Sequence, residues 1–170
     1  MGCRFLRISN AMRLTVQTDY SLRVLLYLGL RPDRLCSIRE IAGAYGISEN
    51  HLMKVVHRLG LFGFVRTVRG RNGGLALARP AADLGVGEVV RRTEEDMVLV
   101  ECFSPDGKCP ISGACTLQGV LDEALAAFLA VLDRYTLADL MGPAAAMAAR
   151  LGVPLPDAPA APAVAEPALT

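Results

Sequence analysis

The sequence predicts a mainly α fold with a small β-wing, in which a winged helix-turn-helix domain is followed by one long helix. Three observations support this prediction. The 170-residue chain has no tryptophan and 5% aromatic residues, while 52% of its residues are hydrophobic, a composition typical of aliphatic helical proteins. Two short helical patterns joined by a glycine precede a hairpin pattern. An apolar helical pattern then covers residues 117–140.

The first helix is predicted over residues 18–30, TDYSLRVLLYLGL. Its apolar side chains at positions 22, 25, 26 and 28 follow helical spacing. Thr18 and Asp19 are residue types that favour a helix start, so we expect the helix to begin there.

A short second helix is predicted over residues 36–46, CSIREIAGAYG. Ser37 is placed to open it, and Glu40 follows three residues later, as in a capping box. Gly46 is expected to end the helix, because glycine is the residue type that most easily takes the left-handed conformation after a helix.

A third helix is predicted over residues 47–60, ISENHLMKVVHRLG, beginning at Ser48 and ending at Gly60. Positions 52, 55, 56 and 59 form its apolar face. Two short helices joined by a tight glycine turn are a helix-turn-helix candidate, although other helical hairpins share this pattern.

The segment at 64–78, FVRTVRGRNGGLALA, alternates as a strand, turns through GRNGG and alternates again. It predicts a β-hairpin. A hairpin directly after a helix-turn-helix is the element order of a winged helix, so the hairpin strengthens the fold prediction.

Charge is distributed unevenly along the chain. Residues 13–80 hold eleven Lys and Arg against four Asp and Glu, a net +7, and residues 81–170 hold five against thirteen, a net −8. A basic first half indicates contact with a polyanion, and the order of elements favours double-stranded DNA over a merely solvated surface. The candidate DNA-contacting residues are Ser37, Ser48, Asn50, His51, Lys54, Arg58, Arg66, Arg69 and Arg71.

The second half begins with a predicted short helix over 84–96 and continues with the long helix over 117–140. The apolar stripe of that long helix is expected to pack on a second copy, giving a homodimer. The predicted divisions of the chain are an N-terminal extension (1–11), the winged helix-turn-helix domain (12–80), a connecting helix and cysteine loop (81–116), the dimerisation helix (117–141) and a flexible Ala/Pro-rich tail (142–170).

Three of the five cysteines, Cys102, Cys109 and Cys115, are spaced as C-x6-C-x5-C. Thiolates are soft ligands that select zinc, copper or iron–sulfur clusters. The tight C-x2–4-C pairs of structural zinc sites are missing, and iron–sulfur clusters accept wider spacing. From the residues we therefore expect an iron–sulfur cluster first, zinc second and a thiol switch third. Cys36 is expected to be a small buried apolar residue, and Cys3 is given no functional role.

With these motifs the chain resembles a known family. MRLTVQTDYSLRVLLYLGL, IAGAYGISENHLMKVVHRLG and VRTVRGRNGGLALARP resemble the winged-helix iron–sulfur regulators that include IscR, RirA and NsrR. CFSPDGKCPISGACTLQGVLDEALAAFLAVLDRYTLADL resembles the NsrR branch. The resemblance spans residues 12–141. It implies a homodimeric repressor that binds a palindromic operator and releases it when nitric oxide nitrosylates its cluster.

The resemblance also implies a set of cluster ligands. Cys102, Cys109 and Cys115 would hold the cluster, expected as [4Fe–4S] with [2Fe–2S] as the alternative. IscR-like members have a histidine ligand three residues after the last cysteine, where this chain has Gln118. NsrR-type members can take a carboxylate from the first helix of the other subunit, and Asp19 is the matching residue. The gap between the first two cysteines is at the long end for the family.

Two alternatives stay open: a regulator of the same family that senses iron or cluster supply, and an iron–sulfur electron-transfer protein. No catalytic triad or nucleotide loop indicates an enzyme. No apolar stretch reaches membrane-spanning length, and the leader lacks the long apolar region of a secretory signal. We therefore expect a cytoplasmic protein with reduced thiols and no membrane partner.

Overall fold

The computed structural model of the chain describes residues 13–103 and 106–154. The predicted extension at 1–11 and the last part of the predicted tail, 155–170, lie outside the described residues. The elements are α1 (Val16–Gly29), α2 (Ile38–Tyr45), α3 (Glu49–Leu61), β1 (Val65–Val68), β2 (Gly74–Leu77), the 3-10 turn η1 (Ala81–Asp83), α4 (Val86–Thr93), the 3-10 turn η2 (Glu101–Phe103), α5 (Thr116–Asp133), α6 (Leu137–Leu140) and α7 (Ala144–Leu151).

The central helix, α1, begins at Val16, two residues earlier than the sequence pattern predicted. Thr15 is its cap, because the Thr15 hydroxyl accepts a hydrogen bond from the backbone N–H of Thr18 at 3.3 Å. Thr18 is fully buried inside the helix, so it does not start it. The inner face of α1 is built from side chains with at most 1% exposure: Val24, Leu25, Tyr27 and Leu28.

The turn into α2 follows the predicted cap at Ser37, whose hydroxyl accepts from the Glu40 N–H at 3.1 Å. The other half of the predicted capping box does not form. The Glu40 carboxylate instead accepts from the Tyr27 hydroxyl at 2.8 Å and from Arg34. Gly46 ends α2 with φ +64°, as predicted.

Helix α3, the second helix of the helix-turn-helix candidate and called the recognition helix below, follows Ser48 as predicted but does not stop at Gly60. It runs to Leu61, and Phe62 is its cap residue. The left-handed residue is Gly63, with φ +74°, so the chain reverses three residues later than expected. Glycine costs a helix only about 1 kcal/mol, which packing on α1 readily outweighs.

The predicted hairpin is confirmed. β1 and β2 pair antiparallel, with Val65 opposite Leu77 and Val68 opposite Gly74. On the other side of β2, Cys36 forms an isolated antiparallel bridge with Leu75. The Cys36 N–H donates to the Leu75 carbonyl at 2.9 Å, and the Leu75 N–H donates to the Cys36 carbonyl at 2.8 Å. Because Leu75 pairs with Thr67, next to the last pair before the turn, the link between α1 and α2 is tied to the part of β2 close to the wing tip.

The helix predicted over 117–140 is two helices. α5 ends at Asp133, and Thr136 opens α6 with a complete capping box formed with Asp139. Two backbone hydrogen bonds explain the break, because Val86 N–H donates to the Tyr135 carbonyl at 2.9 Å and Leu137 N–H donates to the Leu84 carbonyl at 2.8 Å. The buried Leu137 thus belongs to the main core rather than to the stripe of the long helix.

The interpretation of residues 142–170 as a flexible tail is wrong for the part that the structure describes. α7 forms there, and its Ala148 is 2% exposed. Leu151 and Val153 pack against the main core. The buried Arg31 donates to the Pro154 carbonyl and so ties this end of the chain to the end of α1.

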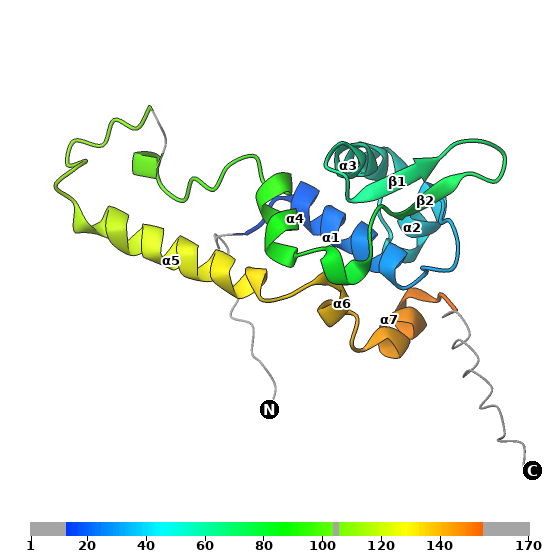
Figure 1. Ribbon diagram of the computed structural model, residues 1–170. Helices are drawn as coiled ribbons and strands as arrows, with labels where there is room; N and C mark the ends of the chain where they lie inside the picture. Colours follow the sequence, from blue (N-terminus) through cyan, green and yellow to red (C-terminus); the bar gives the residue numbers. More distant parts are fainter. Residues whose placement is uncertain (1–12, 104–105, 155–170) are drawn as a thin grey trace, which may run out of the picture.

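The arrangement places two parts of the molecule far apart (Figure 1). The winged-helix unit, defined as α1–α3 with β1 and β2, packs with α4, α6 and α7. α5 projects away from it. The cysteine segment, defined as residues 97–103 and 106–115, starts beside the residues that precede α1 and follows α5 to its outer end. A mainly helical fold with one two-stranded sheet is thereby confirmed. Within the described ranges, no helix is long and apolar enough to cross a membrane.

Candidate DNA interface and metal-binding segment

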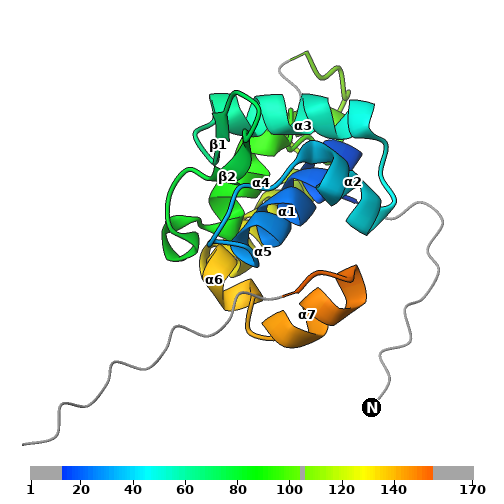
Figure 2. The same cartoon turned by 90° about the vertical axis from the view of Figure 1, so that its right-hand side faces the viewer.

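The recognition helix separates its apolar and polar residues onto opposite faces. Its buried side chains follow helical spacing: Leu52, Val55, Val56 and Leu59. The predicted DNA-contacting residues Ser48, Asn50, His51 and Lys54 are all exposed. Figure 2 shows α3 along one edge of the molecule, with the wing beside its C-terminal end. Such a helix can present polar groups to base edges and cations to phosphates.

Arg58, in the last turn of α3, is the predicted contact that forms an ion pair within the described residues. Its Nη1 lies 3.3 Å from Oε1 of Glu95, and its guanidinium lies 5.9 Å from the centre of the Phe62 ring. The Arg58 side chain is 31% exposed and that of Glu95 is 80% exposed. Arg58 is thus held at one edge of the α3 face.

The start of the helix pair contains one cation that sequence reasoning missed. Arg39 of α2 is 85% exposed and lies 3.3 Å from Glu49, in the first turn of α3. Ser37, a predicted contact, is also exposed but uses its hydroxyl to cap α2. Helical spacing on α2 could have identified Arg39, since it lies on the far side of the helix from the buried Ile41.

The wing carries three exposed arginines, as the sequence predicted. Arg66 lies on β1 near its base, opposite Ala76. Arg69 and Arg71 flank Gly70, whose φ of +116° is available to glycine but strained for other residues. None of the three side chains has a hydrogen bond or ion pair within the described residues, so their charges are available to a polyanion.

The three clustered cysteines lie on a single segment but are not gathered. Cys102 is in η2, and Cys115 is the cap residue of α5. Cys102, Cys109 and Cys115 are all partly buried and free. Among the described residues, no three His, Cys, Asp or Glu side chains lie close enough together to hold a metal ion. The Gln118 amide donates to the Cys102 carbonyl at 3.5 Å, which links the first cysteine to the start of α5.

The donor set nevertheless fits a soft metal or an iron–sulfur cluster. Three thiols on one irregular segment supply three soft ligands, one short of a closed four-coordinate shell. Gly113 has φ +84° and so permits a tight turn between the last two cysteines. A closed four-coordinate shell would need a fourth donor besides these three thiols.

Asp19, the predicted fourth donor, lies in the first turn of α1 and is paired within its own helix. Its Oδ2 lies 2.7 Å from Nη2 of Arg23, and its Oδ1 accepts from Nε of Arg23 at 3.0 Å. α1 lies within the winged-helix unit, whereas Cys115 is the cap residue at the outer end of α5 (Figure 1). Asp19 and the cysteines are therefore not brought together within one chain.

The remaining thiol, Cys36, has a structural position. Its side chain is fully buried beneath the wing. Burial raises the pKa of the Cys36 thiol, and the neighbouring Glu40 carboxylate adds to this effect. A thiol in this environment is a poor ligand and a poor nucleophile.

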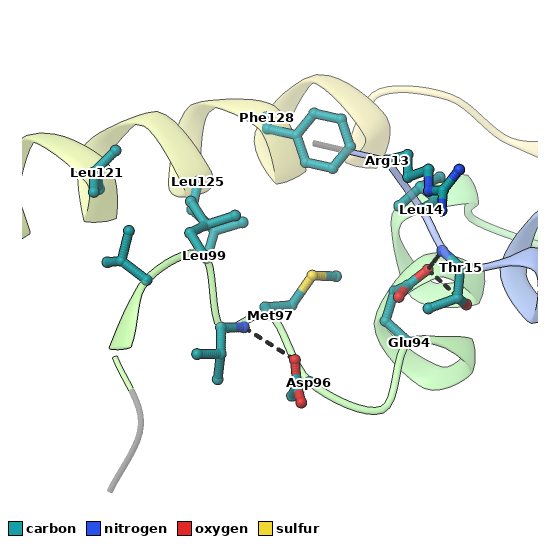
Figure 3. Close-up of a pocket in the computed structure, with 12 residues that line it drawn as sticks. Arg13, Leu14, Thr15, Glu94, Asp96, Met97, Leu99, Leu121, Leu125 and Phe128 are labelled. Carbon is teal, nitrogen blue, oxygen red and sulfur yellow. Dashed lines mark hydrogen bonds between the residues drawn. The ribbon is translucent and has the colours of Figure 1, made fainter. Parts of the chain in front are cut away.

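α5 has no buried residue in the single chain. Leu117, Val120 and Val131 expose 57%, 59% and 43% of their surfaces. On another side of the helix a cavity of about 760 Å³ opens toward the cysteine segment. Figure 3 shows Leu121 and Leu125 of α5 facing this cavity, across from Leu99. An exposed apolar surface of this kind is typical of an interaction site.

Comparisons with known proteins match the chain to transcriptional regulators. The family model Rrf2, described as an iron-dependent transcriptional regulator, matches residues 14–143. The HTH-type transcriptional regulator NsrR of Bacillus subtilis is 55% identical over 132 residues, which are 76% of this chain and 90% of that protein.

Two solved structures share the fold. A candidate transcriptional regulator from Listeria innocua has a TM-score of 0.65 and 29% identity, covering 78% of this chain and 88% of that one. The IscR of T. potens has a TM-score of 0.64 and 27% identity, covering 79% and 89%. α7 begins after the end of the family match.

Proposed function

The chain belongs to the Rrf2 family of transcriptional regulators, and we propose that it is a repressor whose hold on DNA depends on an iron–sulfur cluster that senses nitric oxide. In this proposal residues 12–80 bind DNA, residues 81–116 provide the connecting helix and cluster loop, and α5, within residues 117–141, joins two copies. Relatives named as transcriptional regulators have a non-enzymatic role.

One observation supports DNA binding most directly: exposed polar residues of α3 and unpaired arginines of the wing lie on neighbouring elements. Asn50 and His51 suit base edges, and Lys54 suits a phosphate. Arg69 and Arg71, at the tip of a thin hairpin, suit a narrow and strongly negative minor groove. Two such units in a homodimer would bind a palindromic operator in double-stranded DNA, with the half-site spacing set by the dimer.

The cysteine segment is proposed to hold the cluster through Cys102, Cys109 and Cys115. Asp19 from a second copy of the chain is proposed as the fourth donor, since it is part of the winged-helix unit and 46% of its side chain is exposed. The cluster, [4Fe–4S] ahead of [2Fe–2S], supplies the reaction with nitric oxide. In the resting state the residues of this chain would connect the cysteine segment of one copy to α1 of the other, and thereby fix the distance between the two recognition helices.

A regulator that responds to iron supply is the second candidate, favoured by the family description as iron-dependent. The two candidates differ in the signal and not in the residues. Both assign the three cysteines to a cluster and the winged-helix unit to DNA.

The experiment that tests the proposal is anaerobic purification with iron and sulfide analysis, followed by titration of the chain's own promoter DNA in gel-shift assays. A complex lost on addition of nitric oxide supports the proposal. A complex that ignores nitric oxide but is lost on iron removal assigns the chain to iron sensing. Cluster-loaded protein that binds no promoter DNA would favour an electron-transfer role.

Serine variants test the ligands in the same assay. Cys102→Ser, Cys109→Ser and Cys115→Ser should each lose iron and sulfide, whereas the buried Cys36→Ala should retain them. Zinc or no metal in the wild-type protein would contradict the cluster.

A further inference from the structure

Arg58 of the recognition helix and Glu95 of the segment after α4 form the one ion pair that joins these two parts of the described structure. The pair spans 3.3 Å between Nη1 and Oε1. Glu95 has no other hydrogen bond or ion pair in the described ranges, and 80% of its side chain is exposed. The carboxylate therefore has one neighbour of opposite charge, and that neighbour is a predicted DNA contact.

Arg58 shares a face of α3 with two other basic residues. His51, Lys54 and Arg58 are three and four residues apart, a spacing that aligns side chains on one helical face. Within the described structure, only Arg58 among these three has a carboxylate partner. Glu95 thus removes one of the charges that this face would offer to DNA.

We propose that Glu95 competes with a DNA phosphate for Arg58 and thereby lowers the affinity of the protein for DNA. The inference rests on the proposed function. Carboxylate and phosphate bind a guanidinium through the same charge-assisted hydrogen bonds. A phosphate that reaches Arg58 would also lie close to the Glu95 carboxylate, and like charges at this separation repel. Bound DNA therefore has to displace Glu95 or tolerate its charge.

The position of Glu95 depends on contacts made by its neighbours in the chain. Glu94 accepts two hydrogen bonds from Thr15, one from the backbone N–H at 2.8 Å and one from the hydroxyl at 3.1 Å. These bonds tie the segment to the start of α1. Cys102 follows seven residues after Glu95. Glu95 thus lies two residues before the cysteine segment, and its pair with Arg58 is a noncovalent link between that part of the chain and the recognition helix.

The test compares Glu95→Gln with Asp96→Asn in the full-length, cluster-loaded protein. The probe is a labelled duplex of the chain's own operator, titrated anaerobically at about 0.1 M salt, where surface charges still act over ~10 Å. Both changes remove one exposed carboxylate from adjacent positions. The Asp96→Asn side chain keeps an oxygen that can accept from the Val98 N–H, as the carboxylate of Asp96 does. The control variant thus reproduces the change in net charge without touching Arg58.

We expect Glu95→Gln to bind DNA about two- to five-fold more tightly than the wild-type protein, the range that an exposed ion pair can supply. Asp96→Asn should change the affinity by much less. In an Arg58→Gln background, Glu95→Gln should give no further gain, since the residue through which it acts is gone.

An equal gain in DNA affinity for Glu95→Gln and Asp96→Asn would mean that only the net charge matters, and it would overturn the inference. A gain that persists without Arg58, or no gain at all, would overturn it too. Wild-type protein that binds no operator DNA would instead contradict the proposed function. The two failures are therefore distinguishable.

Discussion

The carboxylate of Asp19 lies 2.7 Å from the guanidinium of Arg23, one turn further along α1. The Arg23 guanidinium is in turn placed 5.7 Å from the ring centre of Tyr20 and 5.9 Å from that of Tyr45. Arg23 therefore holds Asp19 in a defined orientation at the start of α1. A metal that took Asp19 as a ligand would have to share this carboxylate with Arg23 or displace it.

Asp19→Asn should make the cluster easier to remove without preventing folding. The amide is a weaker ligand than the carboxylate but keeps its shape, so loss of iron to a chelator should be about ten-fold faster or more. The measurement is the rate of iron release from the anaerobically purified protein. Asp33→Asn, an exposed carboxylate at the other end of α1, is the matched control. Unchanged iron content and unchanged release would remove Asp19 from the proposed ligands.

Neutralising a wing-tip arginine should weaken DNA binding regardless of sequence. Arg69→Gln or Arg71→Gln should each reduce the magnitude of the slope of log affinity against log salt by about one. Each variant loses one phosphate contact and, with it, the counterion that this contact releases. Titrations at several salt concentrations on operator and unrelated duplexes measure this slope. Arg150→Gln, which removes an exposed charge from α7, should leave it unchanged. An equal effect of all three variants would contradict a specific role for the wing.

A charge on the outer face of α5 should separate the two copies of the proposed dimer. Val120 is 59% exposed in the single chain, and burying a glutamate there without a partner costs at least about 2 kcal/mol. Val120→Glu should therefore halve the mass measured by sedimentation at micromolar concentration. Asp122→Asn, on the opposite side of the helix, should not change the mass. A Val120→Glu variant with the wild-type mass would place the interface elsewhere.

Glu40 should make stability depend on pH in the acid range. The hydrogen-bonded Arg34 is the main cause that lowers the pKa of Glu40 to about 2 in the folded protein, from a usual 4.5. A lowered folded-state pKa stabilises the protein above pH 4.5, and this contribution is lost as the pH falls toward 2. Glu40→Gln should therefore be less stable by roughly 1–2 kcal/mol at pH 7, after allowance for solvent screening, and equal to wild type near pH 2.

Urea unfolding at a series of pH values measures the Glu40 effect. Glu49→Gln is the control, since its exposed pair with Arg39 should contribute at most about 0.5 kcal/mol. A difference between Glu40→Gln and wild type that is the same at pH 2 and pH 7 would mean that packing, not charge, explains it.

Local signals predicted the parts of the fold that local chemistry controls. Gly46 marks the turn of the helix pair and the GRNGG stretch marks the hairpin, because both need glycine conformations. The break after Asp133 carries no such signal. It results from backbone hydrogen bonds to Leu84 and Val86, which lie about fifty residues away in sequence. α7 was missed for a related reason. Its alanine-rich sequence resembles a low-complexity segment, and the burial of Ala148 depends on residues distant in sequence.

In the candidate site, too, local features were predictable from the sequence and contacts between distant residues were not. Residue types and spacing indicated which side chains of α3, the wing and the cysteine segment are available for chemistry. In the structure the wing arginines and the predicted α3 residues other than Arg58 are exposed. Spacing could not indicate that Arg58 is paired with Glu95, since 37 residues separate them. Nor could it place Cys102, Cys109 and Cys115 relative to one another, because irregular segments have no period.

The β-bridge between Cys36 and Leu75 affects the conformational entropy that the wing loses when it binds DNA. Its two hydrogen bonds fix the start of β2, close to the turn of the hairpin, to the link between α1 and α2 before any ligand is present. A flexible wing would lose conformational freedom on meeting a groove, and each ordered residue would subtract from affinity. Here that loss is confined to the few residues around Gly70, so most of the recognition surface is preorganised by folding itself.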